Sequence, residues 1–212
     1  MPKGQKTRER IVAEAASLFN QRGFEGSSMS ELMEATGLEK GGIYRHFSSK
    51  EELAAKAFDY AWKVTLDTRM RDLDRIPNSI DKLKQFVANF VDRPRPPVPG
   101  GCPLLNTAVD ADDGNPVLRD RALKGLHDWR DRLRSIISMG IKRREVRRGV
   151  DSKELATLII SSLEGALMIA RLERDREALV AARSHLESHL ETEVRRLASD
   201  VSGERTGKQE GS

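Results

Sequence analysis

Cysteine and long apolar runs are the scarcest features of this sequence of 212 residues. The single cysteine, Cys102, excludes an intrachain disulfide and a metal site built from four cysteines. No apolar run approaches the roughly 20 residues that span a bilayer. The N-terminal segment is basic but lacks the apolar stretch and small-residue cleavage site of a signal peptide. We therefore expect a cytoplasmic protein without a membrane partner.

Charge, by contrast, is abundant and mixed in sign. Charged residues make up 33% of the chain, hydrophobic residues make up 38%, and the formal net charge is +4. With the 16 glycines added, the apolar content lies at the low end of the globular range. This is enough for a buried core and excludes full disorder. The length fits one large domain or two small ones.

Hydrophobic residues recur with helical spacing over almost the whole chain. Ile11, Ala15, Leu18 and Phe19 lie three or four residues apart, and the alternating patterns typical of strands are scarce. The sequence therefore predicts an all-α fold of about nine helices. Their approximate ranges are 6–22, 28–36, 40–47, 48–73, 78–91, a short helix starting at 102–103, 116–148, 151–172 and 176–198.

Three of these helices begin with residues that cap a helix N-terminus. Ser28 with Glu31 forms a capping-box pattern, in which each side chain pairs with the backbone of the other residue. The same pattern is predicted at 48–51 and, with aspartate in place of serine, at 151–154. Between the fifth and sixth helices, residues 92–101 hold four of the eight prolines and are predicted to be a loop.

Residues 28–47 have the proportions of a helix-turn-helix motif, with two short helices joined by a glycine turn. In that motif the second helix enters the DNA major groove while the first crosses the backbone. Residues 40–50 include three basic and no acidic side chains, which favours attraction to phosphates. One side of the unit is apolar, through Leu32, Leu38, Ile43 and Phe47, and the other presents Lys40, Gly41, Gly42, Tyr44, Arg45 and His46.

Two adjacent glycines are unexpected in a helix, because each costs about 1 kcal/mol relative to alanine. Gly41 and Gly42 make sense where the helix backbone must approach a phosphate or a base edge closely.

The stretch GFEGSSMSELMEATGLEKGGIYRHFSSKEEL, residues 23–53, closely resembles the DNA-binding domain of tetracycline-repressor (TetR) family regulators. The matching positions are Gly23-Phe24, Ser27-Ser28, Gly37-Leu38, Lys40 to Phe47, and Ser49-Lys50-Glu51 with Leu53. Thr36 stands where the family has alanine, and Leu32-Met33 replaces its usual Ile-Ala. These departures are small or apolar changes at packing positions.

The resemblance implies a role for each matching residue. Ser28, Tyr44, His46 and Lys50 stand at positions that contact phosphates, while Lys40, Gly42 and Arg45 stand where family members reach bases. Arginine is also the side chain best suited to bidentate reading of guanine. Two alternatives remain open: Tyr44 packs against the first helix, and Lys50 is a solvated lysine in a first helical turn.

The resemblance also implies the domain organisation. Residues 1–50 are expected to form the DNA-binding domain, 51–201 a ligand-binding and dimerisation domain, and 202–212 a disordered tail. The expected function is that of a repressor, active as a homodimer on a palindromic DNA operator. Dimerisation is expected through the eighth and ninth helices, by Ser161, Ser162, Gly165 and Ala166, continued by Leu186, Leu190 and Val194.

A small-molecule effector of unknown identity is expected to release the repressor from DNA, and no cofactor is expected. The apolar candidates for its pocket are Phe86, Phe90, Leu105, Trp129, Leu133 and Met168, and the polar ones are Asn106, His127 and Glu164.

A second hypothesis is a redox or electrophile sensor that acts through Cys102. This cysteine is predicted at a helix N-terminus, where the helix dipole favours the thiolate, with Arg93 and Arg95 nearby in sequence. The competing interpretation is a buried, inert thiol.

Other sites are not supported by the sequence. His185 and His189 have a metal-binding spacing but no third ligand, so no metal is expected. The basic run at 142–148 is typical of a solvated helix end. No set of residues suggests an enzyme.

Overall fold

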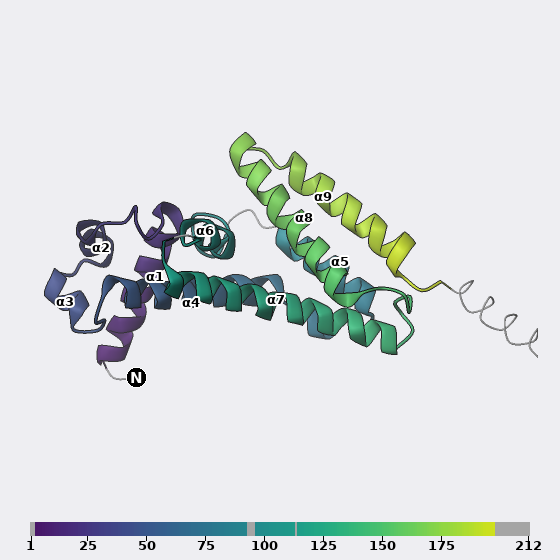
Figure 1. The fold of residues 1–212 in the computed structure, drawn as a ribbon, viewed down its shortest axis with the longest axis horizontal. Coiled ribbons are helices and arrows are strands. Elements are labelled where there is room, and N and C mark those ends of the chain that lie inside the picture. The colour runs from purple at the N-terminus through teal and green to yellow at the C-terminus, as the bar shows by residue number, and fades with distance from the viewer. Residues whose placement is uncertain (1–2, 93–95, 113, 198–212) are drawn as a thin grey trace, which may run out of the picture. The chain divides into compact units, whose positions relative to one another are not determined.

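The computed structural model describes residues 3–92, 96–112 and 114–197. Over these residues the chain forms nine α-helices, which confirms the predicted all-α fold (Figure 1). The predicted disordered tail, 202–212, lies outside the described residues. The helices are α1 (Lys3–Arg22), α2 (Met29–Thr36), α3 (Lys40–Tyr44), α4 (Lys50–Arg69), α5 (Ser79–Val91), α6 (Pro103–Asp110), α7 (Pro116–Lys142), α8 (Ser152–Glu173) and α9 (Glu177–His189).

Two long helices end earlier than the sequence predicts. The fourth was expected to reach residue 73, but α4 ends at Arg69, and Asp72 then adopts a left-handed conformation with φ of 61°. The seventh was expected to reach residue 148, but α7 ends at Lys142, and Arg144 has φ of 62°. Left-handed backbone does not continue a right-handed helix, so the chain turns at both places.

The last helix also differs from the prediction, because α9 ends at His189 rather than near residue 198. A π-helical turn, Leu190–Val194, follows it. Beyond this turn Arg195 forms an isolated antiparallel bridge with Val146, so the segment pairs with the chain that follows α7 instead of remaining helical.

The predicted N-terminal caps are present, one of them displaced by a residue. Asp151 caps α8, accepting hydrogen bonds from the amides of residues 153 and 154. At α4 the cap is Ser49 rather than Ser48, because Ser49 Oγ accepts from the Glu52 amide at 3.0 Å. The Glu52 carboxylate in turn accepts from the Ser48 amide at 2.7 Å. The hydrogen bonds from Ser48 lower the pKa of Glu52.

The chain divides into two compact units. The first contains residues 1–70 and 92–129, and the second contains residues 71–91 and those from 130 onward. The division falls within α7. The first unit therefore holds the predicted DNA-binding domain together with all of α4 and α6.

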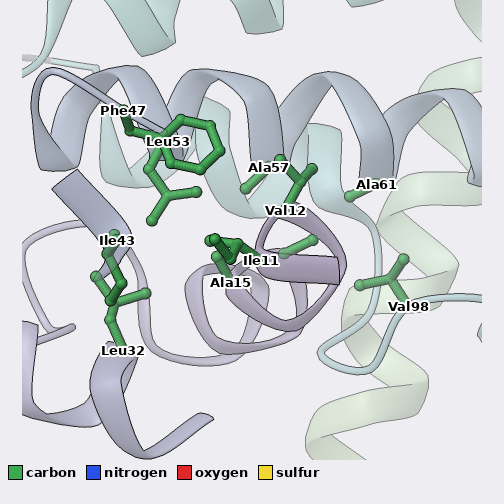
Figure 2. Close-up of a cluster of buried hydrophobic side chains, with 11 residues drawn as sticks. Ile11, Val12, Ala15, Leu32, Ile43, Phe47, Leu53, Ala57, Ala61 and Val98 are labelled. Atoms are coloured by element: carbon green, nitrogen blue, oxygen red, sulfur yellow. The ribbon is translucent and has the colours of Figure 1, made fainter. Parts of the chain in front are cut away.

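A single apolar cluster holds the helices of the DNA-binding region together. Ile11 and Ala15 of α1, completely buried, lie between Leu32 of α2 and Leu53 of α4 (Figure 2). Ile43 of α3 packs into the same cluster, as does Phe47 just after that helix. The orientation of α3 is thus fixed by buried side chains from α1, α2 and α4.

In the first unit, α6 is attached to the end of α1 by polar contacts. Asn106 Nδ2 donates to the backbone oxygen and to Oδ1 of Asn20, both at 2.9 Å. The Phe24 amide donates to the Asp110 carboxylate at 2.7 Å. Gly23 permits this approach: its φ is +77°, and a Cβ atom there would lie 2.4 Å from the Asp110 carboxylate.

In the second unit, α9 packs against both α5 and α8, and Figure 1 shows α8 and α9 running side by side. Leu186, Leu190 and Val194 are buried within this packing. The expectation that they continue a dimer face is therefore wrong, because the chain's own core covers them. Ala166 of α8 is buried as well, so the prediction that it belongs to the dimer face is wrong for the same reason.

A polar network links α5 to the end of α9. Glu191 accepts hydrogen bonds from Lys84 at 2.7 Å and Arg195 at 2.6 Å, and Arg195 also donates to Asp81 at 2.6 Å. These bonds, that from Arg195 first, lower the pKa of Glu191 from 4.5 to about 2.

One helix has the length and hydropathy of a membrane span, contrary to the expectation that no run would qualify. This is α8, with a mean hydropathy of 1.6 over its most apolar 18-residue window. In this structure 44% of that window is buried, as happens when a helix packs in a helical domain.

Candidate nucleic-acid interface

The first helix of the motif is fixed at both ends. Ser28 Oγ accepts from the Glu31 amide at 3.2 Å, and the Glu31 carboxylate accepts from the Ser28 amide at 2.7 Å, so the predicted capping box is present. The hydrogen bonds that the Ser28 amide and then the Ser28 hydroxyl donate to this carboxylate lower the pKa of Glu31. At the other end Gly37 has φ of 64°, the left-handed conformation that glycine adopts without a steric penalty. The turn into α3 is therefore well defined.

The second helix, α3, is shorter than predicted, because it ends at Tyr44 and residues 45–46 form a turn. Ile43 is buried on its inner side, while Lys40 and Arg45 are exposed and Tyr44 is 39% exposed. Anchoring by Ile43 thus directs a basic and aromatic surface outward.

The two glycines of α3 are not required by the fold itself. A Cβ atom on Gly41 would meet no atom within 4 Å, and one on Gly42 would make only ordinary contact with Leu38, at 3.5 Å. Neither residue has a left-handed backbone. Internal packing therefore does not explain this costly pair, and the predicted close approach of a phosphate or base edge stays a prediction.

Lys50 lies at the edge of this surface and already has an internal partner. Its Nζ donates to the Phe24 carbonyl at 2.6 Å and lies 4.3 Å from the centroid of the Phe24 ring. An ammonium has three donors, so two remain for a phosphate. Lys50 therefore has a structural role that the sequence did not reveal, beside the phosphate contact predicted for it. His46, in the turn that follows α3, is half-buried.

Two arginines near the N-terminus also hold the motif in place. Arg10 Nη1 donates to the Thr36 carbonyl at 2.6 Å, satisfying an oxygen at the end of α2. The Arg8 guanidinium lies 4.6 Å from the Phe47 ring centroid. These contacts link α1 to the end of α2 and to the segment that follows α3.

The nine predicted pocket residues divide between the two units. Asn106 is engaged in the contact of α6 with α1, while His127 and Met168 are exposed. The first unit contains Leu105, Asn106, His127 and Trp129, of which Trp129 is completely buried; the second contains Phe86, Phe90, Leu133, Glu164 and Met168.

Cys102 is the N-cap residue of α6, as predicted, and is 2% exposed. Arg93 and Arg95, expected near it, lie outside the described residues.

Sequence reasoning missed a buried polar and aromatic cluster on α4. Trp62, Thr65 and Arg69 lie on the inner side of that helix and are each at most 7% exposed. The sequence did contain a signal for this cluster, because Arg69 lies at helical spacing from Trp62 and Thr65, on the side of the helix that is otherwise apolar.

A short basic helix, presented outward by a buried core and joined to its neighbour by a glycine turn, defines a helix-turn-helix DNA-binding protein. Residues 11–57 match the family of bacterial regulatory proteins called the tetR family, and residues 79–186 match the tetracyclin repressor-like C-terminal domain. The chain therefore belongs to the TetR family of DNA-binding transcriptional regulators. Its members are regulators and not enzymes.

Known relatives extend this similarity over most of the chain. A TetR transcriptional regulator from Chloroflexus aurantiacus is 46% identical, with a TM-score of 0.89 over 93% of this chain and 100% of that one. The transcriptional repressor DhaR from Mycobacterium sp. strain GP1 is 26% identical, over 81% of this chain and 86% of that protein. A cysteine mutant of the TetR family regulator CifR, complexed with 26-bp operator DNA, is 25% identical with a TM-score of 0.74, over 85% of this chain and 94% of that one.

Proposed function

We propose that the protein is a repressor that binds a palindromic operator as a homodimer and leaves it when a small-molecule effector binds. The observation that carries this proposal is the exposed side of α3, where Lys40, Tyr44 and Arg45 surround an open glycine backbone. The relative DhaR is a repressor, and the CifR structure contains a double-stranded operator, which supports the same mode of action here.

The contacts with DNA divide into two kinds. Lys40, Gly42 and Arg45 read bases, and Arg45 is the residue suited to a bidentate contact with guanine. Ser28, Gly41, Tyr44, His46 and Lys50 approach phosphates, which position the motif without reading sequence. Tyr44 is exposed enough to reach DNA from its place on α3.

The homodimer forms through an exposed apolar stripe on α8. Leu158, Met168, Ile169 and Leu172 are between 40% and 77% exposed, and a Cβ atom on Gly165 would meet nothing within 4 Å. Ser161 and Ser162 lie on the same helix at matching spacing, so the stripe presents small residues between large apolar ones. Val180 of α9 is also 58% exposed. A second copy of the chain would cover this surface, and two motifs would then read one half-site each.

Effector control follows from the attachment of α6 to α1. Asn106 and Asp110 hold the end of α1 and the Phe24 amide, so a displacement of α6 also moves the motif. An effector that favours the displaced arrangement weakens operator binding, and by linkage the operator weakens effector binding by the same factor. The effector site includes Trp129 in the first unit.

The experiment that tests the function is selection of bound duplexes from a random DNA pool, repeated over a salt series. An enriched palindrome with a steep dependence of affinity on salt supports the repressor. Arg45→Ala should relax the base preference at one position of each half-site, whereas Lys50→Ala, at a proposed phosphate contact, should weaken binding to all sequences alike. Equal sequence profiles for wild type and Arg45→Ala would remove Arg45 from base reading.

The redox alternative depends on Cys102, which is buried at the N-terminus of α6. Burial favours an inert thiol, since reactive cysteines are partly exposed. We therefore place the reversible effector first. If peroxide releases operator DNA from wild type but not from Cys102→Ser, the cysteine is the sensor instead.

A further inference from the structure

Two buried side chains on α4 present polar atoms that have no partner. Trp62 is 6% exposed and Thr65 is 5% exposed. Within the described part of the chain, neither Trp62 Nε1 nor Thr65 Oγ1 has a hydrogen-bond partner. The two residues are three apart on one helix and so share a face. An indole N–H can only donate, and therefore the Trp62 ring requires an acceptor that this structure does not supply.

Arg69 continues the same face of α4 one turn further on. It is 5% exposed, and its guanidinium carbon lies 4.5 Å from the centroid of the Trp129 ring and 5.7 Å from that of Trp62. The two indole rings are 5.5 Å apart and inclined by 59°. The cluster formed by Trp62, Thr65, Arg69 and Trp129 thus combines aromatic walls, a permanent positive charge and donors. We call it the tryptophan–arginine cluster.

The chemistry of this cluster selects one class of ligand. A carboxylate accepts paired hydrogen bonds from a guanidinium and further bonds from an indole N–H and a hydroxyl. A cationic ligand is disfavoured, because the faces of both indoles already contact a guanidinium. A planar ring next to the carboxylate would pack against the indoles.

Building on the effector control proposed above, we propose that the effector is a small aromatic carboxylic acid, bound as its anion by the tryptophan–arginine cluster. Its carboxylate accepts hydrogen bonds from Trp62 Nε1, Thr65 Oγ1 and Arg69, and its ring lies against Trp129. Trp62 Nε1 and Thr65 Oγ1 have no partner within the described part of the chain, and the carboxylate would supply one to each and remove the penalty of burying them unpaired. Ligand binding therefore favours an arrangement of α4 and α7 different from the one seen here.

Intrinsic fluorescence provides a specific readout, because the chain has two tryptophans and both belong to the cluster. The full-length protein is titrated with benzoate, phenylacetate, cinnamate and 1-naphthoate. The matched neutral probes are the corresponding primary amides, and the cationic probe is benzyltrimethylammonium. We expect at least one acid to change the emission saturably and to weaken operator binding at least tenfold. Its amide should bind at least tenfold more weakly, and the cation should not bind.

Variants separate recognition from folding. Arg69→Met and Trp62→Phe should each weaken binding of that acid at least tenfold. Trp62→Phe removes the indole N–H, while the fluorescence of Trp129 still measures binding. The control is Lys63→Met, which removes a positive charge from the exposed side of the same helix, where Lys63 pairs with Asp67. It should bind the acid as the wild type does. Operator binding without ligand should persist in all three variants, which shows that they fold.

Three results would overturn the inference. One is equal binding of an acid and its amide, and another is equal binding of an acid by wild type and Arg69→Met. The third is no response to any of the four acids while operator binding is intact, in which case the repressor stands and the ligand class is wrong. Absence of sequence-specific operator binding in the wild type would instead contradict the proposed function itself.

Discussion

Lys50 offers the sharpest test of how this DNA-binding domain is built, because the structure gives it two roles. Its ammonium holds the Phe24 carbonyl and ring, and it also lies beside the proposed DNA surface. Lys50→Met removes the hydrogen bond, the cation–π contact and the charge. Lys50→Gln removes the charge but keeps an amide donor for the Phe24 carbonyl.

The expected magnitudes follow from these contacts. A hydrogen bond to a charged group contributes about 1.5–3 kcal/mol, and a partly exposed cation–π contact about 0.5–1 kcal/mol. Since Lys50 is only partly buried, we expect Lys50→Met to lose about 2 kcal/mol of stability. For a chain of this size that lowers Tm by roughly 4–8 °C. Lys50→Gln should lose less than half as much.

Operator binding separates the phosphate contact from the structural role. If Lys50 touches one phosphate in each subunit of the dimer, either substitution lowers the slope of log K against log salt by about 0.9 per contact, or roughly 1.8 in total. Calorimetry measures Tm. Fluorescence anisotropy with labelled operator, over a salt range of about 50–300 mM, measures the slope. An unchanged slope in Lys50→Gln would refute the phosphate contact, and an unchanged Tm in Lys50→Met would refute the structural role.

Three further predictions concern the core, a charged network and the dimer. Ile43→Ala should lower the free energy of unfolding by about 2–5 kcal/mol and weaken operator binding, whereas Ile43→Val should lower it by about 0.5–1.5 kcal/mol. Chemical unfolding measures both values, and similar losses for the two variants would contradict the anchoring of α3 by Ile43. Glu191 has a lowered pKa of about 2, so its bonds stabilise the fold above pH 4.5 and are lost as the pH falls toward 2; the stability difference between wild type and Glu191→Gln should shrink over that range, and a constant difference would argue against the network. Leu172→Asp should shift sedimentation from dimer to monomer, and Lys153→Asp, at an exposed position nearer the start of α8, should not.

The fold was predictable from the sequence because its signals are local. Helical spacing, N-terminal caps and glycine turns each depend on a few neighbouring residues, and Ser28, Gly37 and Asp151 act as the sequence indicates. The errors occur where distant segments decide the outcome. After the π-helical turn at Leu190–Val194, Arg195 pairs with Val146, a partner that no local pattern specifies.

The exposed residues of the candidate site were predictable from the sequence, but the contacts that hold the motif in place were not. Lys40, Tyr44 and Arg45 are exposed as expected, since the apolar spacing of Ile43 and Phe47 defines the inner side of the motif. The link from Lys50 to Phe24 joins residues 26 apart, and that from Asp110 to Phe24 joins residues 86 apart. Such contacts depend on how helices pack, which a single sequence does not display. The prediction that Leu186 lies on a dimer face failed for the same reason, because an apolar residue on α9 can pack either against the chain's own core or against a second copy of the chain.

The structure places both ends of the proposed regulation on one helix. Lys50 at the start of α4 holds the Phe24 carbonyl, while Asp110 of α6 holds the amide of the same residue, so Phe24 is fixed from both sides. Trp62 and Arg69 belong to the C-terminal half of that helix. Nineteen residues separate Lys50 from Arg69, or about 29 Å along a straight helix. A helix this long, buried along most of its inner side, transmits a tilt rather than absorbing it. If the proposed effector acts on the far end of α4, it would reach the DNA-binding motif through Lys50 and Phe24, without needing contact with α2 or α3.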